Sequence, residues 1–129
     1  MKTIMQLIFV SIFMLVTTPS YSGVATQMWK CEMVADTSEE DVEKMAQDWL
    51  KAAKQVEGGE KLEAYVYFPV AVNVTGATDL MFVVVAPSFE DWGKFWDRYP
   101  DSEAAKKEDK NKIVCPDSAL WESIEVKVE

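Results

Sequence analysis

The chain has 129 residues, and 22 acidic residues against 13 lysines and arginines give it a formal net charge of −9. Nucleic acids and anionic membrane surfaces bind basic patches, so this balance argues against both as partners. The sequence contains no histidine, which excludes Ser–His–Asp and Cys–His catalysis and removes the commonest ligand of zinc and haem sites. We therefore expect no metal and no cofactor.

The first 22 residues predict an export signal. One lysine stands near the start, an apolar run fills residues 4–16, and small and polar residues lead to a cleavage site after Ser22 or Ala25. This is the order of regions in a secretory signal peptide. The apolar run is shorter than the roughly 20 residues of a membrane-spanning helix. We expect residues 23–129 to form a single exported domain, periplasmic or extracellular, with no membrane segment after cleavage.

The first two elements of this domain are a strand and a helix. Residues 27–34 (QMWKCEMV) alternate apolar and charged side chains with a period of two, which predicts a strand. In residues 38–59 the apolar side chains recur every three or four positions, which predicts an amphipathic helix. Ser38 is a good N-cap before an acidic first turn, and Gly58 and Gly59 supply the stop.

Two more strands follow, and they predict a hairpin. Residues 62–74 are rich in β-branched and aromatic side chains, the sequence TGATD then turns the chain, and residues 80–87 form a second apolar run. Pro69 lies in the first of these runs. Because proline cannot donate a hydrogen bond to a neighbouring strand, it indicates an edge position or a bulge.

The last part of the chain predicts a second helix and a final strand. Ser88 caps a helix whose aromatic side chains keep helical spacing up to Tyr99, where Pro100 follows. Residues 101–112 are charged and predict a short exposed helix, and residues 119–128 alternate as a strand. The resulting order β-α-β-β-α-β predicts an α+β, ferredoxin-like sandwich, in which the first and last strands lie side by side and antiparallel.

The two cysteines of the chain are predicted to pair. Cys31 lies in the first strand, and Cys115 precedes the last strand by a few residues, so the ferredoxin-like arrangement brings them near each other. An exported chain with two cysteines is expected to oxidise them to a structural disulfide. The alternative is a reactive thiol, which needs an activating histidine, a basic neighbour or a CxxC partner.

The central strands are too apolar for a sheet with one face in water. Residues 65–72 (YVYFPVAV) and 80–86 (LMFVVVA) are apolar on both faces, as antiparallel strands are when both faces are covered. No third amphipathic helix remains in the sequence to cover the second face. We therefore expect a homodimer whose two sheets pack face to face. The alternative is a monomer that carries a modest hydrophobic patch.

Five short motifs in a fixed order add a resemblance. WKCEM, SEEDV followed by a tryptophan, VEGG, FEDW and CPDSALW resemble those of a family of small exported, uncharacterised bacterial proteins of the dimeric α+β-barrel type. The resemblance spans nearly all of residues 27–125. It implies a ferredoxin-like fold, face-to-face dimers and a paired cysteine, and it implies no established activity. The haem enzymes of the wider barrel superfamily depend on a histidine ligand, which this chain lacks.

Similarity to the cofactor-free monooxygenases of this superfamily implies a pocket between sheet and helices, built from aromatic and asparagine side chains. The candidate pocket residues are Trp49, Tyr65, Tyr67, Asn73, Trp92 and Trp96. The competing interpretation is that such tryptophans at helical spacing belong to the core, and that Asn73 is an ordinary turn residue. Lys30 and Glu32 alternate to the face opposite Trp29, so in a dimer they would point toward the barrel interior and need partners.

These observations predict a protein that binds a small apolar or aromatic molecule. One alternative is a cofactor-independent monooxygenase or isomerase that uses the same aromatic-lined pocket. A second alternative is an acidic protein-interaction module. The acidic residues at 39–43 and at Glu90 and Asp91 stand at predicted helix starts, where they compensate the helix dipole, so we expect no metal site there.

Overall fold

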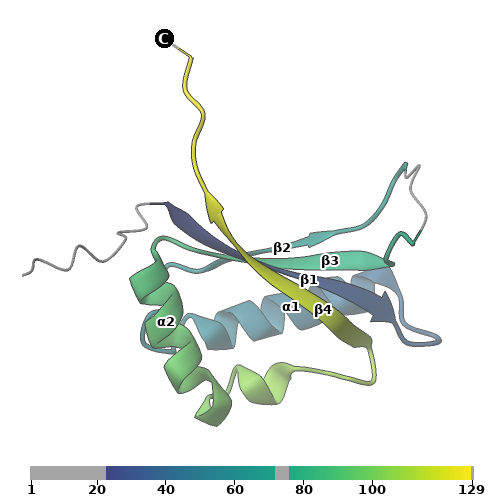
Figure 1. Cartoon of the computed structure of the whole chain (residues 1–129). Helices are drawn as coiled ribbons and strands as arrows, with labels where there is room; N and C mark the ends of the chain where they lie inside the picture. Colours follow the sequence, from purple (N-terminus) through teal and green to yellow (C-terminus); the bar gives the residue numbers. More distant parts are fainter. Residues whose placement is uncertain (1–22, 72–75, 129) are drawn as a thin grey trace, which may run out of the picture.

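The computed structural model describes residues 23–71 and 76–128, and their elements follow the predicted order. Figure 1 shows strands β1 to β4 as one twisted layer, with helices α1 and α2 beneath it. The bounds are β1 Val24–Met33, α1 Glu39–Ala53, β2 Glu63–Tyr67, β3 Leu80–Ala86, α2 Phe89–Arg98 and β4 Ile113–Ser123, with short 3-10 turns η1 (Tyr99–Asp101) and η2 (Ala105–Lys107) before β4.

The four strands form a single sheet in the order β2-β3-β1-β4, and all neighbouring strands are antiparallel. This is the strand order of the ferredoxin-like fold, so the predicted fold class is confirmed. None of the helices in the described part of the chain is both long and apolar enough to cross a membrane.

Both helices begin at the predicted caps. The Ser38 hydroxyl accepts a hydrogen bond from the Asp41 backbone N–H at 3.1 Å, and the Asp41 carboxylate accepts one from the Ser38 backbone N–H at 3.1 Å. This reciprocal pair is a capping box. Ser88 accepts from the Asp91 backbone N–H at 3.0 Å in the same way. Helix α1 ends at Ala53, before the predicted stop, and Gly58 follows with a φ of 84°.

The strand boundaries differ from the predicted ones. Strand β2 ends at Tyr67, so Pro69 lies beyond it rather than within it. Strand β4 begins at Ile113, six residues before the predicted start, and ends at Ser123. It ends there because Ser123 pairs with Val24, the first residue of β1, so the following residues have no pairing partner on β1. They extend away from the sheet in Figure 1.

An irregularity in β4 sets the cysteines opposite each other. Lys30 pairs with Asp117 and Glu32 pairs with Val114, so two residues of β4 stand opposite the single residue Cys31. One of the two is Cys115 and the other is a proline, and proline is accepted at such a bulge because it has no N–H to donate. Cys31 and Cys115 form a disulfide, as predicted.

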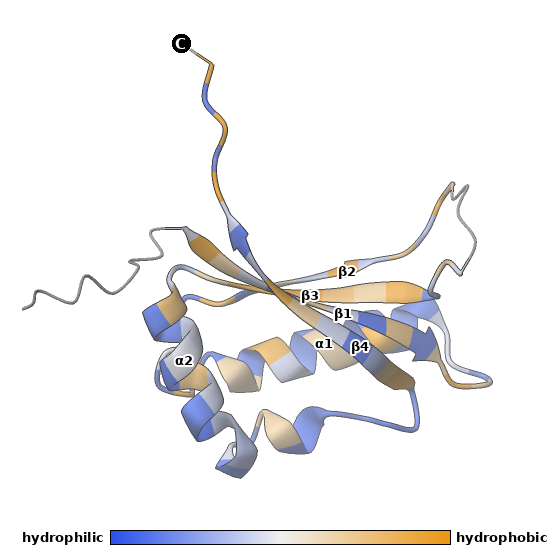
Figure 2. Ribbon diagram, viewed as in Figure 1, coloured by the Kyte–Doolittle hydropathy of each residue, from blue (hydrophilic) through white to orange (hydrophobic). Residues whose placement is uncertain are grey.

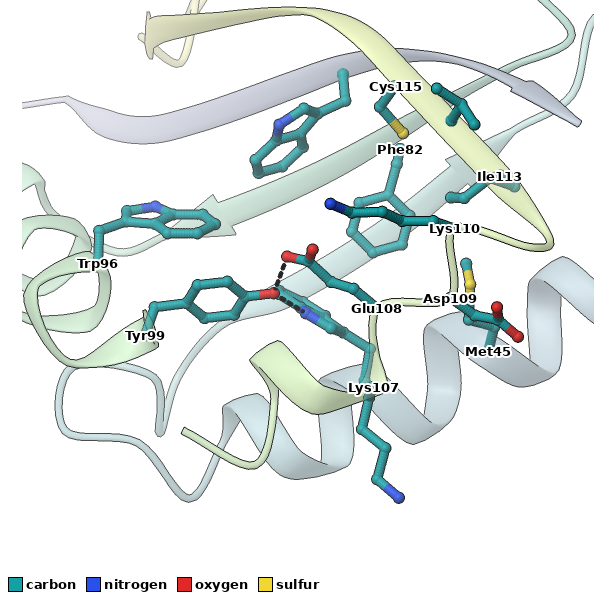
Figure 3. A pocket seen from close by; sticks show the side chains of 13 residues that line it. Met45, Phe82, Trp96, Tyr99, Lys107, Glu108, Asp109, Lys110, Ile113 and Cys115 are labelled. Atoms are coloured by element: carbon teal, nitrogen blue, oxygen red, sulfur yellow. Dashed lines mark hydrogen bonds between the residues drawn. The ribbon is translucent and has the colours of Figure 1, made fainter. Parts of the chain in front are cut away.

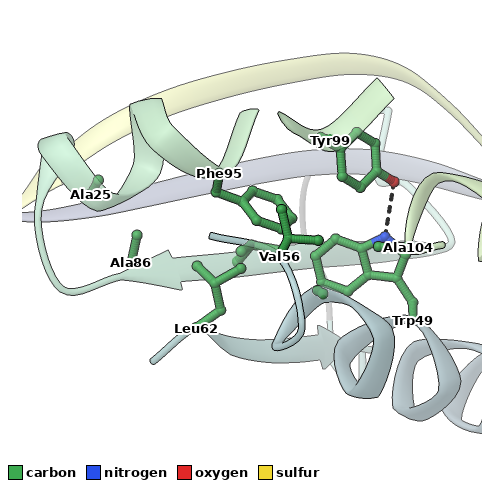
Figure 4. Packing of buried hydrophobic residues seen from close by; sticks show 10 residues of the cluster. Ala25, Trp49, Val56, Leu62, Ala86, Phe95, Tyr99 and Ala104 are labelled. Carbon is green, nitrogen blue, oxygen red and sulfur yellow. Dashed lines mark hydrogen bonds between the residues drawn. The ribbon is translucent and has the colours of Figure 1, made fainter. Parts of the chain in front are cut away.

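The core lies between the sheet and the helices (Figure 4). Alternate residues of β1 and β3 meet the apolar sides of α1 and α2, and Phe95 and Leu62 are fully buried among them. A smaller cluster surrounds the disulfide and includes Val42 of α1 and Leu80 of β3. We call this side of the sheet the covered face.

The opposite side of the sheet, here called the open face, carries the alternate side chains of each strand, those that point away from the helices. No helix covers it in the part of the chain that the structure describes (Figure 1). Figure 2 shows that the ribbon of β3 is apolar along its length, whereas β1 alternates between apolar and hydrophilic residues. The apolar residues of the open face include Met28, Tyr65, Tyr67, Met81, Val83, Val85, Ala119 and Trp121. The polar Thr26 lies among them, and its hydroxyl shares a hydrogen bond of 2.6 Å with the Ser123 hydroxyl. Lys30 and Glu32 also lie on this face and are exposed, opposite in direction to Trp29 as the alternation predicts.

Candidate functional site

A cavity of about 440 Å³ lies between the covered face and the helices (Figure 3). Its size falls in the range of small-molecule sites, about 300–1,000 Å³. The sheet contributes the side chains of β1 and β3 and the start of β4, α1 and α2 contribute the sides, and residues 107–110 form the rim. Its aromatic lining residues are Trp29, Trp49, Phe82, Trp96 and Tyr99.

These aromatic side chains support one another. The ring centroids of Trp29 and Phe82 lie 6.0 Å apart, those of Trp29 and Trp96 lie 5.7 Å apart, and Trp49 meets Phe82 edge-on at 5.4 Å. These separations are typical of attractive tilted and edge-to-face pairs. These four rings come from four different elements, so each fixes the orientation of the next. Together Trp29, Trp49, Phe82 and Trp96 form a preformed surface, here called the aromatic wall.

Tyr99 ties the wall to the rim. Its hydroxyl accepts a hydrogen bond from Trp49 Nε1 at 2.9 Å and donates one to the Glu108 carboxylate. Burial raises the pKa of the Tyr99 phenol well above its ordinary value, and the hydrogen bond to Glu108 raises this pKa further. Tyr99 is therefore a neutral phenol with both hydrogen-bonding functions in use, and it is not available as a general base near neutral pH.

The rim carries four charged side chains with different orientations. In Figure 3 the Lys110 side chain extends into the cavity, whereas Lys107 points away from it. Glu108 accepts the hydrogen bond from Tyr99, and Asp109 Oδ1 accepts one from the Asn111 backbone N–H at 3.0 Å. Lys110 is thus the cationic group that this rim presents to the cavity.

Only part of the predicted pocket is assembled. Trp49 and Trp96 line the cavity. Trp92 packs against Trp96, with ring centroids 6.4 Å apart, but it is not one of the lining residues. Asn73 lies outside the described residues.

The prediction that Tyr65 and Tyr67 line the pocket is wrong, because both side chains lie on the open face. Their neighbours Ala64 and Val66 pack into the core, so the alternation of a strand sends both tyrosines to the other side of the sheet. The two rings stack with centroids 6.2 Å apart, and the Tyr65 hydroxyl donates to Glu63 at 2.5 Å. They cannot contribute to the cavity on the covered face.

Several lining residues were not predicted. Trp29 had a usable signal, because it alternates in phase with Cys31 and so lies on the same face of β1. Phe82 could have been placed in the same way, because it alternates in phase with Leu80 and Val84 of β3. No such indication exists in the sequence for Lys110, because this residue lies in the irregular segment between η2 and β4, whose position depends on how the chain packs.

Two polar atoms near the cavity have no partner. The indole N–H groups of Trp92 and Trp96 are buried, and neither has a hydrogen-bond acceptor among the residues that the structure describes. Each such group costs about 1–3 kcal/mol. Since both atoms are shielded from solvent, we do not count either as a donor to a ligand. Across the part of the chain that the structure describes, no group of three or more cysteine, aspartate, glutamate or histidine residues is placed to hold a metal ion.

Comparison with known proteins adds little beyond this geometry. No family model matches the sequence. No curated protein matches it either. The family resemblance of the five motifs therefore stays a prediction.

Similar solved structures include "Putative Chlorite dismutase TA0507", with 10% identity and a TM-score of 0.49 over 84% of this chain and 47% of that chain. The chlorite dismutase from Candidatus Nitrospira defluvii in complex with imidazole has 16% identity and a TM-score of 0.43, over 84% of this chain and 43% of that chain. The chain spans less than half the length of these proteins.

Proposed function

We propose that this protein binds a small, flat, apolar or aromatic molecule in the cavity between the sheet and the helices. The observation that carries the proposal is the aromatic wall. Trp29, Phe82 and Trp96 are only partly buried, and each turns ring surface toward the cavity. Aromatic surface facing a preformed hollow favours a planar ligand, because the ligand removes that surface from water and adds ring–ring contacts.

A blocking substitution tests this proposal. The probe is N-phenyl-naphthylamine, an uncharged ring compound whose fluorescence rises in apolar surroundings. Met45 lines the cavity from α1, so Met45→Trp should fill part of it. Gln47→Trp is the matched control, because Gln47 is exposed on the same helix.

We expect wild type and Gln47→Trp to bind the probe and to gain thermal stability with its concentration, as ligand linkage requires. Met45→Trp should keep its fold, measured by circular dichroism, and lose at least tenfold in affinity, or about 1.4 kcal/mol. Equal binding to all three proteins would place the probe elsewhere and contradict the proposal.

We further propose that the protein is a homodimer in which the open faces of two copies meet. Tyr65, Tyr67 and Trp121 remain 43%, 52% and 57% exposed on this face. An apolar sheet face of this kind is an aggregation risk unless a partner covers it. A second copy presents the same surface, and symmetric dimers use such self-complementary faces. In this arrangement Lys30 and Glu32 would lie in the barrel interior.

Native mass spectrometry and sedimentation at micromolar concentration test the dimer. Tyr67→Lys places a charge on the open face and should shift the protein to monomers, whereas Gln47→Lys on α1 should leave the dimer intact. A wild-type protein that is monomeric throughout would refute this arrangement.

We also propose that the protein is exported and that its first 22 residues are removed. The support is the order of charged, apolar and small residues in the sequence. Fractionation of expressing cells, with intact-mass measurement of the exported form, tests this. A mature protein that retains residues 1–22 in the cytoplasm would contradict it.

The catalytic alternative has less support. A cofactor-independent monooxygenase or isomerase needs a group that removes a proton from the substrate. The phenol of Tyr99 is held in its protonated form, and Glu108, the carboxylate that contacts it, already accepts its hydrogen bond. We therefore favour binding over turnover.

A further inference from the structure

We infer that the cavity selects a ring compound with an acidic group, such as an aromatic carboxylate or sulfonate, and that Lys110 binds the acidic group. This inference rests on the proposed binding function and names the class of its ligand. It requires a cation at the cavity that is not already neutralised and a polar group on the ligand that can reach it.

Lys110 meets the first requirement. Its side chain extends from the rim into the cavity in Figure 3. Within the described ranges no ion pair of 4.0 Å or less joins it to an acidic residue, whereas six other lysine and arginine side chains have such partners. The ammonium group of Lys110 is therefore available for an anion.

The other charges of the rim are either occupied or turned elsewhere. Glu108 is the acceptor for the Tyr99 hydroxyl, and Asp109 accepts from the Asn111 backbone. Lys107 points away from the cavity. Because Glu108 is itself an anion at the rim, a bound acid must turn its charged group toward Lys110 and away from Glu108, which fixes its orientation.

The aromatic wall then receives the ring. Trp29, Phe82 and Trp96 line the cavity from the sheet and from α2, and they offer apolar surface. A ligand with a ring at one end and an anionic group at the other would place each end in matching surroundings. The chain as a whole carries a charge of −9 and repels anions at long range, so a local cation is needed for an acid to bind.

A pair of probes that differ in one acidic group tests this inference. Anilinonaphthalene sulfonate has the ring system of N-phenyl-naphthylamine with an added sulfonate, and both fluoresce when buried. The proteins are wild type, Lys110→Gln and the control Lys107→Gln, which removes the same charge three residues away on the outward side of the rim. Circular dichroism and thermal unfolding confirm that all three are folded.

We expect Lys110→Gln to weaken binding of the sulfonate about fivefold and to leave the uncharged probe unchanged, because an ion pair at an exposed rim has a modest strength. Lys107→Gln should change neither affinity by more than about twofold. Salt should weaken sulfonate binding more in wild type than in Lys110→Gln.

Three results would overturn the inference. They are an unchanged sulfonate affinity in Lys110→Gln, an equal loss for both probes, and an equal loss of sulfonate binding in Lys107→Gln. The proposed binding function fails separately, if the uncharged probe does not bind wild type or if Met45→Trp leaves its binding unchanged.

Discussion

The two faces of the sheet are built from the same strands, but they have different environments. Val84 and Val85 are neighbours in β3 and are the same residue type, yet Val84 lies fully buried beneath the helices while Val85 is only partly buried on the open face. The hydrophobicity of a strand therefore indicates how much apolar surface the fold must bury. The position of the helices decides which of the two sheet faces is buried within a single chain.

The covered face also holds the specific interactions of the domain. The disulfide, the Trp49–Tyr99 hydrogen bond and the cavity all lie on the helix side of the sheet. The open face carries mainly apolar and aromatic side chains, such as Tyr65 and Tyr67, whose rings stack on each other within β2. Substitutions on the covered face should therefore affect folding of the single chain, and those on the open face should affect association.

The largest effect is expected from the disulfide. The double substitution Cys31→Ala and Cys115→Ala opens a link across 84 positions of sequence and should lower the free energy of unfolding by roughly 4–5 kcal/mol on the chain-entropy model. Urea unfolding under oxidising conditions measures this loss. Reduction of the wild-type protein should reproduce it. A loss below about 1 kcal/mol would mean that packing alone holds the start of β4 in place.

The next prediction compares Val84→Ala with Val85→Ala. Val84→Ala should lower the free energy of unfolding by about 2 kcal/mol, because it removes two buried methyl groups and leaves a cavity. Val85→Ala should cost less than about 1 kcal/mol in the single chain. If two copies meet at the open face, the loss for Val85→Ala should vary with protein concentration. If both substitutions lower the free energy of unfolding by similar amounts at every protein concentration, the two faces do not differ in the way that we propose.

Tyr99→Phe tests the polar link within the covered face. It leaves the buried Trp49 N–H without its acceptor and should cost about 1–3 kcal/mol at pH 7. The fold raises the pKa of Tyr99. The contribution of this residue to the free energy of unfolding is therefore fully present below the pKa of about 10 that tyrosine has in the unfolded chain, and it is lost as the pH rises further. The difference in stability between wild type and Tyr99→Phe should therefore decrease at alkaline pH. Thermal unfolding from pH 7 to 11 measures it. A constant difference would show that ionisation of Tyr99 is not linked to folding.

The smallest effect is expected at the N-terminal cap of α1, one of the two helices that cover the sheet (Figure 1). Hydrogen bonds from the Ser38 backbone and side chain hold the pKa of Asp41 below its ordinary value, and Lys112 lies 3.2 Å from its carboxylate. Asp41→Asn should slightly lower the melting temperature at pH 7. Because a lowered pKa stabilises the fold above the unfolded value, this difference should shrink as the pH falls below about 4. A difference that persists at pH 2 would contradict the linkage.

The sequence by itself determined the elements and their order. Ser38 and Ser88 cap the helices where local hydrogen bonding requires it, and these contacts span only three residues. The alternation in β1 placed Cys31 and Trp29 on one face, and the count of two cysteines predicted their pairing. Each of these conclusions depends on neighbours in sequence or on composition, which are visible without coordinates.

The tertiary structure decided the rest. The tyrosines of β2 alternate in the sequence, but only the packing of Ala64 and Val66 against the core shows that Tyr65 and Tyr67 face away from the cavity. The bulge opposite Cys31 depends on the register between strands that are distant in sequence. Lys110 reaches the cavity because an irregular segment crosses its mouth, and no local periodicity encodes that path, since its position is fixed by contacts with elements far away along the chain.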